Sequence, residues 1–197
     1  MNQLPTGRFG LSYRGLCRAC QATNFADDGP KTSTKRHIVD RVIMLTPPTA
    51  TDAALHRLQL VVISYHRLTG RHLVDERNPD LWQACWSAPR VIVAHGTEVD
   101  PIFFYGNALA LSQFELDFKA FTQLRSRYSA EPLLREERAA LLARVHEHGF
   151  IDDYAGVRIA ASGKRFRIEQ AVVWNVIDGA GRRHGQAATF DPGQPVP

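Results

Sequence analysis

The sequence predicts an α+β fold in which helices cover one face of a five-stranded antiparallel sheet and a further helix flanks it on the N-terminal side. Three observations support this prediction. Apolar residues recur at spacings of three and four between residues 54 and 68, which is the period of an amphipathic helix. A period of two governs the runs 155–159, 166–176 and 183–190, as in strands. Because short turns separate these runs, neighbouring strands are expected to be antiparallel.

The N-terminal helix is predicted over residues 53–68. Thr51 and Asp52 precede it as good N-cap residues, and Gly70 is a typical C-terminal stop. A second, short helix is predicted near residue 80, because Pro79 suits the first position of a helix.

The next stretch is predicted as strand, turn, strand and helix. Residues 90–94 are rich in β-branched side chains, which favour strands, and residues 102–105 form a second strand after a turn at 96–101. Asn107 then lies where an N-cap residue is expected, ahead of an apolar helical segment. A longer helix is predicted over residues 135–149, where a glycine ends it.

Three strands complete the predicted sheet. The apolar face of the first is formed by Ala155, Val157 and Ile159. The longest strand is expected to present one apolar face throughout, made of Phe166, Ile168, Gln170, Val172, Trp174 and Val176. On the last strand, one face is shared by His184, Gln186, Ala188 and Phe190. The predicted domain therefore covers residues 51–190, between a leader (1–50) and a polar tail (191–197).

The formal net charge of +4 is confined to the leader. Residues 1–43 carry seven Lys and Arg against three Asp, whereas the rest of the chain carries 17 basic and 17 acidic residues. A domain with balanced charge lacks the basic surface that phosphate backbones require, so no nucleic-acid partner is expected. No run of about 18 apolar residues occurs, so no membrane partner is expected either. The leader has no periodicity and is predicted to be disordered, or to lie upstream of a translation start at Met44.

The three cysteines, Cys17, Cys20 and Cys85, are an odd set without a disulfide-rich pattern, which suits the reducing cytoplasm. Cys17 and Cys20 have the C-x-x-C spacing of zinc and redox motifs, but no second ligand pair lies near them in the sequence. The simpler interpretation is a pair of free thiols, and no metal site is predicted.

The order of elements, with an Asn opening the helix after the second strand, is similar to the PAS fold, a sensor domain whose sheet and helices enclose a small cavity. Residues 55–190 more closely resemble a bacterial stand-alone MEKHLA-domain protein. The segments that carry this resemblance are SYHRLTGRHLV (64–74), HGTEVDPIFFYGNALALSQFE (95–115), SRYSAEPLLREERAALLARVHEHGFIDDYAGVRI (126–159), SGKRFRIEQAVVWNVID (162–178) and HGQAATF (184–190).

The MEKHLA domain is regarded as a PAS relative and also forms the C-terminal part of class III homeodomain leucine-zipper plant regulators. The resemblance implies a PAS-like fold with a small cavity, and it brings no enzymatic reaction. No homeodomain or zipper heptads occur in this sequence, so DNA binding is not implied.

Five residues are candidates for ligand contact in such a cavity: His95, Asn107, Gln170, Trp174 and Gln186. Gln170 is the main candidate, because an amide on an apolar strand face needs a hydrogen-bond partner in the protein or in a ligand. For Gln170 the alternative is a structural hydrogen-bond partner or a β-bulge, and for the other four it is a structural role. No residue is predicted to be catalytic.

These observations predict a small-molecule-binding sensor or interaction module without catalytic activity. The ligand is expected to be small and largely apolar, with one or two polar groups, and to bind without metal. Two alternatives stay open. One is a dimerising structural module with a filled core. The other is a small enzyme with an acid-base site made of His95, Ser126, Arg127 and Glu131, although the sequence lacks a G-x-S-x-G, an H-E-x-x-H or a phosphate-binding loop.

No cofactor is predicted. His146 and His148 are two residues apart, so they point to different faces of a helix and are not expected to bind one haem or metal together. A flavin photosensor would need a Cys directly after an Asn, and the sequence has none.

A symmetric homodimer is expected through the helix 53–68. Leu60, Val61, Val62 and Ile63 are consecutive there, and they point in more directions than one sheet covers. PAS domains commonly dimerise through their N-terminal flanking helix. A signalling protein is a further expected partner, because the sequence shows no output domain of its own.

Overall fold

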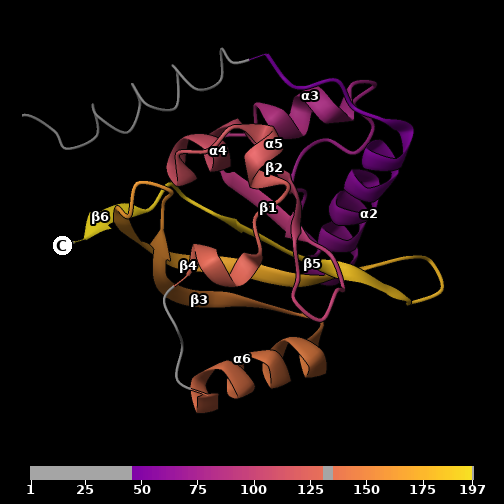
Figure 1. Ribbon diagram of the computed structural model, residues 1–197. Coiled ribbons are helices and arrows are strands. Elements are labelled where there is room, and N and C mark those ends of the chain that lie inside the picture. Colours follow the sequence, from indigo (N-terminus) through magenta and orange to yellow (C-terminus); the bar gives the residue numbers. More distant parts are fainter. Residues whose placement is uncertain (1–45, 131–134, 197) are drawn as a thin grey trace, which may run out of the picture. The chain divides into compact units, whose positions relative to one another are not determined.

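The computed structural model describes residues 46–130 and 135–196 (Figure 1). Within the helix that follows the gap, the side chains of residues 135–139, 142 and 146 are also outside the described set. The predictions for residues 1–45, which include the thiols of Cys17 and Cys20 and the start at Met44, fall outside these residues.

The described elements follow the predicted order of helices and strands. They are α2 (Asp52–Thr69), α3 (Leu81–Trp86), β1 (Val91–His95), β2 (Phe103–Gly106), α4 (Ala108–Phe114), α5 (Phe118–Phe121), the 3-10 turn η1 (Ser126–Ser129), α6 (Arg135–His148), β3 (Phe150–Ile159), β4 (Arg165–Ile177), β5 (Arg183–Phe190) and β6 (Gln194–Val196).

The predicted capping of α2 is confirmed at both ends. The Thr51 side chain accepts a hydrogen bond from the Ala54 N–H at 3.2 Å, as an N-cap residue does. Gly70 adopts the left-handed conformation (φ 70°) and donates its N–H to the His66 carbonyl at 2.8 Å. This conformation favours glycine, and it lets the chain leave the helix in a tight turn.

The strands form one antiparallel sheet in the order β2-β1-β5-β4-β3. The short β6 also pairs with β4, at residues Arg165–Arg167. Residues 194–196 of the predicted polar tail therefore extend the sheet. The predicted α+β architecture, with a five-stranded antiparallel core, is confirmed.

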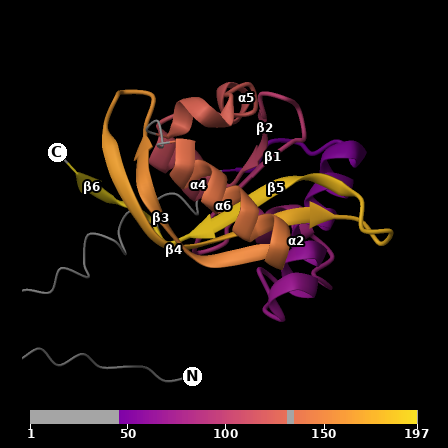
Figure 2. The same cartoon turned by 90° about the horizontal axis from the view of Figure 1, so that it is seen from below.

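Both faces of the sheet are covered. Along β1, Val91 and Val93 join the apolar core beneath α4, α5 and α6, whereas Ile92 and Ala94 join a second core beneath α2 and α3. Figure 2 shows α6 crossing the strands β4 and β5, with α2 beyond them. The flanking helix therefore packs on the opposite face of the sheet from α4 and α6.

Aromatic rings dominate the two cores. On the α4 side, Phe103 stacks on Phe121 with ring centroids 4.6 Å apart. On the α2 side, Trp174 is fully buried, meets Tyr65 edge to face at 4.9 Å, and donates its indole N–H to the Val61 carbonyl at 3.2 Å. A buried ring of this size contributes roughly 1.5–3 kcal/mol, so Trp174 is a main anchor of α2 on the sheet.

A bulge changes which face each residue of β4 points to. Tyr154 pairs with Ala171 and Gly156 with Ile168, so β4 has one residue more than β3 in this interval. The extra residue lies at Gln170, whose backbone is left-handed (φ 50°). The predicted single apolar face over residues 166–176 is therefore wrong, because β4 switches faces at the bulge. On the α4 side lie Phe166, Ile168, Ala171 and Val173, and on the α2 side lie Val172, Trp174 and Val176.

Residues 46–50 belong to the predicted leader but contact the domain. The Pro48 carbonyl accepts a hydrogen bond from the Trp82 indole N–H at 2.9 Å, and Ala50 packs against the core beneath α2. Among the described residues, no helix combines the length and the hydropathy that a bilayer crossing requires.

Candidate functional site

A cavity of about 130 Å³ lies between the sheet and the helices of the α4 side. Strands β1, β2, β3, β4 and β5 form its floor and sides, while α4, η1 and α6 cover it. Its apolar lining consists of Val93, Phe103, Phe114, Leu141, Tyr154, Ile168, Val173, Ala187, Ala188 and Phe190. Its polar lining consists of His95, Ser126, Ser129, Arg158 and Gln186. The cavity is thus mostly apolar with a few polar groups, which is the usual make-up of a small-molecule site.

The bulge at Gln170 helps to form the cavity floor. Ile168 and Val173 are five positions apart, and an odd separation would place them on opposite faces of a regular strand. The extra residue turns both side chains toward the cavity. Opposite them, β5 contributes the small side chain of Ala188, which leaves the space open.

His95 and Gln186 come from adjacent strands and are paired in register. His95 Nδ1 lies 2.9 Å from the Gly96 carbonyl oxygen. Gln186 Nε2 donates to Asn175 Oδ1 at 3.2 Å, and Asn175 Nδ2 donates in turn to the Val145 carbonyl of α6 at 3.1 Å. A chain of side-chain hydrogen bonds therefore connects the cavity to α6.

Arg158 supplies the cationic group of the cavity lining. Its guanidinium donates to the Tyr154 hydroxyl at 3.1 Å and lies 5.2 Å from the centroid of the same ring. The backbone of Arg158 also forms a β-bridge with Ala130, which holds the end of η1 beside β3. An arginine in this position suits a carboxylate or another anionic acceptor group.

Asn107 is placed by the structure as an architectural residue. It is fully buried, and its Oδ1 accepts from the Ala110 N–H at 3.0 Å and from the Ile92 N–H at 3.1 Å. Its Nδ2 donates to the Arg90 carbonyl at 2.8 Å. These bonds cap α4 and fix it to β1, and Asn107 does not line the cavity.

Gln170 and Trp174 also lie away from the cavity. Trp174 belongs to the core beneath α2. Gln170 is exposed and lines a surface depression with Arg167, Glu169 and Gln194. The prediction that Gln170 sits on an apolar face is therefore wrong. Of the five candidates, the structure brings only His95 and Gln186 together at the cavity.

Arg158, Tyr154 and Ser129 line the cavity and are not predicted from the sequence. Ser126, which the enzyme alternative groups with His95, lines the cavity as well. The sequence predicts that Ala155, Val157 and Ile159 form the apolar face of β3. In the structure, Tyr154 and Arg158 line the cavity instead. A second register irregularity, between Ile151 and Tyr154, precedes this stretch of β3. The sequence signal for this pair is the even spacing of four residues between Tyr154 and Arg158, which places both side chains on the same face of a strand.

Two further buried groups, Cys85 of α3 and Tyr105 of β2, belong to the core on the opposite face of the sheet. Burial raises the pKa of the Cys85 thiol to about 12. Burial, with a smaller effect of Cys85, raises the pKa of the Tyr105 hydroxyl well above its usual value. Both groups are therefore neutral near pH 7, and neither offers an ionised nucleophile.

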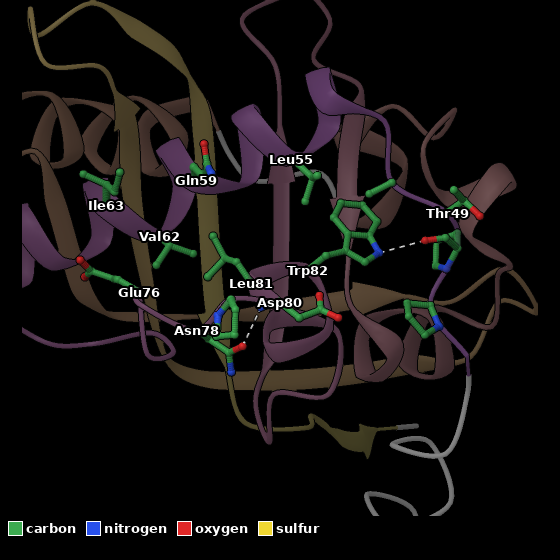
Figure 3. Close-up of a pocket in the computed structure, with 14 residues that line it drawn as sticks. Thr49, Leu55, Gln59, Val62, Ile63, Glu76, Asn78, Asp80, Leu81 and Trp82 are labelled. Atoms are coloured by element: carbon green, nitrogen blue, oxygen red, sulfur yellow. Dashed lines mark hydrogen bonds between the residues drawn. The ribbon is translucent and has the colours of Figure 1, made fainter.

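A larger depression of about 560 Å³ lies between α2 and the segments 47–50 and 76–82 (Figure 3). Figure 3 shows Glu76 and Thr49 toward opposite ends of it, with Leu55, Val62 and Leu81 between them. It lies outside the space between the sheet and the helices α4 and α6. The smaller cavity is the better candidate for a small-molecule site, because apolar walls and polar groups converge there.

Comparisons with known proteins bear on the whole domain. The MEKHLA domain family matches residues 55–193. Two curated relatives are the rice proteins "Homeobox-leucine zipper protein HOX29" of Oryza sativa subsp. indica and subsp. japonica. Each is 25% identical over 142 residues, which is 70% of this chain and 16% of the rice protein. The match thus spans about a sixth of the length of these relatives.

Three solved structures are similar in fold. A PAS domain from Colwellia psychrerythraea is 10% identical over 52% of this chain and 85% of that chain, with a TM-score of 0.46. An "RNA-binding Light-Oxygen-Voltage Receptor" is 20% identical over 56% of this chain and 31% of that chain, with a TM-score of 0.48. A light-oxygen-voltage domain studied with a flavin analogue is 15% identical over 61% of this chain and 87% of that chain, with a TM-score of 0.46.

The matched region begins within α2 and ends just before β6, so it includes every strand and helix around the cavity. The chain therefore belongs to the MEKHLA-domain family.

Proposed function

We propose that this protein is a PAS-like sensor or interaction module that binds a small, largely apolar molecule in the cavity between the sheet and α6, without catalysing a reaction. The observation that carries the proposal is the set of polar groups in a mostly apolar cavity: His95, Arg158, Gln186 and the two serines of η1, Ser126 and Ser129. Family membership supports the sensor class. As the motif resemblance leads us to expect, we also propose that the protein is a bacterial stand-alone MEKHLA-domain protein.

The size of the cavity supports a ligand of about one ring. Its volume of about 130 Å³ is close to that of a cavity of about 150 Å³ known to take up benzene in another protein. The guanidinium of Arg158 suits a carboxylate, and the amide of Gln186 suits a hydroxyl or carbonyl group. A single-ring aromatic acid or alcohol therefore fits both the space and the polar groups.

The hydrogen-bond chain from Gln186 through Asn175 to Val145 offers a route for a signal. A ligand that bonds to the Gln186 amide would compete with Asn175 and so change the attachment of α6. The output would then pass to a partner protein that reads the position of α6.

The expected homodimer through the helix 53–68 remains part of the proposal. In α2, the side chains of Leu58, Val61 and Tyr65 are buried within the protomer, whereas the Ile63 side chain is 51% exposed. A dimer contact would therefore use the outer face of α2 near Ile63.

The experiment is a binding screen of the purified protein against single-ring carboxylates, alcohols and neutral aromatics, read by ligand-observed NMR and native mass spectrometry. Ala188→Leu fills the cavity and is expected to abolish binding of any hit. Arg183→Leu changes an exposed residue of the same strand, β5, outside the cavity, and it is expected to leave binding unchanged. Hits that bind Ala188→Leu equally well would contradict the proposal. A dimerising module without a ligand site would give no hits at all.

A further inference from the structure

Two histidines and one glutamate converge where the chain turns back after α2. His66 lies in the last turn of α2, His72 follows the turn at Gly70, and Glu76 lies four residues further on. Glu76 Oε1 is 3.7 Å from His66 Nδ1 and 3.5 Å from His72 Nδ1. One potential ligand atom from each residue lies within 4.8 Å of the other two.

The carboxylate of Glu76 is the unusual member of this cluster. Its Oε1 is buried and has no hydrogen-bond partner among the described residues. The backbone around it is fixed, because Asp75 Oδ1 accepts from the Arg77 N–H at 3.0 Å and the Asp75 carbonyl accepts from the Asn78 N–H at 3.0 Å. A buried carboxylate oxygen held in place beside two imidazoles needs a cation or a donor as its partner.

We propose that His66, His72 and Glu76 bind a divalent transition-metal ion of the zinc class. Bonds of about 2.0–2.2 Å at tetrahedral angles place ligand atoms about 3.3–3.6 Å apart, close to the two separations observed here. Two imidazoles and one carboxylate suit zinc and its neighbours better than magnesium or calcium, which prefer oxygen ligands. Three protein ligands leave the fourth position open to water or to a group from another molecule. This proposal departs from the metal-free expectation drawn from the sequence.

One ring has to turn for a metal to bind. The two imidazoles are stacked with centroids 4.2 Å apart and an angle of 16° between their planes. A shared metal has to lie near the plane of each ligand ring, which two nearly parallel stacked rings do not allow. The side chain of His72 is 65% exposed and lies outside the helix, so it is the ring with room to turn. His66 Nδ1 also lies 3.3 Å from the Arg71 carbonyl oxygen, and metal binding replaces that contact.

The competing explanation is an ion pair between Glu76 and a protonated histidine, without any metal. Calorimetric titration with Zn²⁺ distinguishes the two. The protein is the full chain without a histidine tag and with Cys17→Ser and Cys20→Ser, so that the C-x-x-C thiols do not bind the ion. We expect one Zn²⁺ per chain, at least tenfold weaker binding in His72→Ala and in Glu76→Gln, and unchanged binding in His56→Ala. His56 is an exposed histidine of α2 outside the cluster, so it is the matched control.

A second measurement does not depend on the variants being folded. Co²⁺ added to the protein with its three ligands intact is expected to broaden the ring-proton NMR signals of His66 and His72 more than those of His56. The proposal is overturned if Zn²⁺ does not bind at millimolar concentration, if both variants bind as tightly as the parent, or if Co²⁺ broadens the three histidines equally. The site is on the α2 side of the fold, so these outcomes are independent of ligand binding in the cavity.

Discussion

Ile168 and Val173 both line the cavity although they are five positions apart on the same strand. The left-handed residue Gln170 between them makes this possible, because it adds one residue to β4 and reverses the alternation of faces. The same bulge places Trp174 in the core beneath α2. One backbone irregularity therefore forms the cavity floor and provides the anchor for the flanking helix.

Gln170→Gly is predicted to stabilise the fold. A left-handed backbone costs a residue with a Cβ roughly 1–2 kcal/mol, whereas the extra flexibility of the unfolded glycine costs roughly 0.5–1 kcal/mol. We expect the free energy of unfolding, measured with urea, to rise by roughly 0.5–1 kcal/mol. Glu169→Gly is the matched control, because Glu169 is not among the residues with positive φ, and it is expected to destabilise. Equal losses in both variants would contradict the role of Gln170.

The sequence predicts the elements well because periodicity and capping are local signals. The N-cap at Thr51, the stop at Gly70 and the N-cap at Asn107 are all confirmed. The cavity depends instead on the phase of each strand. The polar Gln170 within an apolar strand face allows a bulge as one alternative, but glutamine is not a residue that favours positive φ, so the sequence does not decide for it. A shift of one residue exchanges the two faces of a strand. For this reason the sequence predicts Gln170, and not Arg158, as a ligand contact.

Asn107 illustrates a different limit of the sequence. Its position predicted an N-cap, and the cap is present. The two further bonds to Ile92 and Arg90 join elements that are far apart in the sequence, so no local pattern reveals them. Three hydrogen bonds within the protein hold this amide, and the residue is fully buried outside the cavity lining, so it is a framework residue and not a ligand contact.

Ser64→Ala is predicted to loosen α2 from the sheet. Ser64 is fully buried; its hydroxyl donates to the Ile177 carbonyl at 2.9 Å and accepts from the Ile177 N–H at 2.8 Å. Alanine leaves both backbone groups without this partner, so the free energy of unfolding is expected to fall by about 2–3 kcal/mol. Chemical denaturation gives the value, and Ser112→Ala at an exposed position of α4 is the control. A loss no larger than that of the control would show that water replaces the hydroxyl.

Acid stability is predicted to depend on Asp178 in the turn between β4 and β5. The hydrogen bond from His184 Nε2 at 2.9 Å, followed by bonds from Arg182, lowers the pKa of this carboxyl below its ordinary value of 3.8. A lowered pKa in the folded state means that the stabilising contribution is complete above about pH 4 and is lost as the pH falls below that value.

Asp178→Asn removes this titration. The difference in melting temperature between the parent and the variant is therefore expected to be constant near neutral pH and to shrink between pH 4 and pH 2, which is the range below the ordinary pKa of 3.8. Asp153→Asn, at an exposed carboxylate paired with Arg144, is a useful comparison because its pKa is also lowered, by a hydrogen bond from that arginine. A difference for Asp178→Asn that stays constant down to pH 2 would contradict the assignment.

The chain of hydrogen bonds from Gln186 through Asn175 to α6 is predicted to stabilise the C-terminal half of α6. Asn175→Ala removes the acceptor for Gln186 Nε2 and the donor to the Val145 carbonyl, while the backbone bond from the Asn175 N–H to the Gly149 carbonyl at 3.0 Å remains. Hydrogen exchange is therefore expected to accelerate in the C-terminal half of α6 and to stay unchanged in α2, which packs on the other face of the sheet.

Gln186→Leu tests whether the two bonds act together. If they form one connected chain, this change accelerates exchange in α6 when Asn175 is present and has little further effect in the Asn175→Ala background. Additive effects of the two substitutions would show that Gln186 and α6 are not coupled, and the proposed route from the cavity to α6 would be wrong.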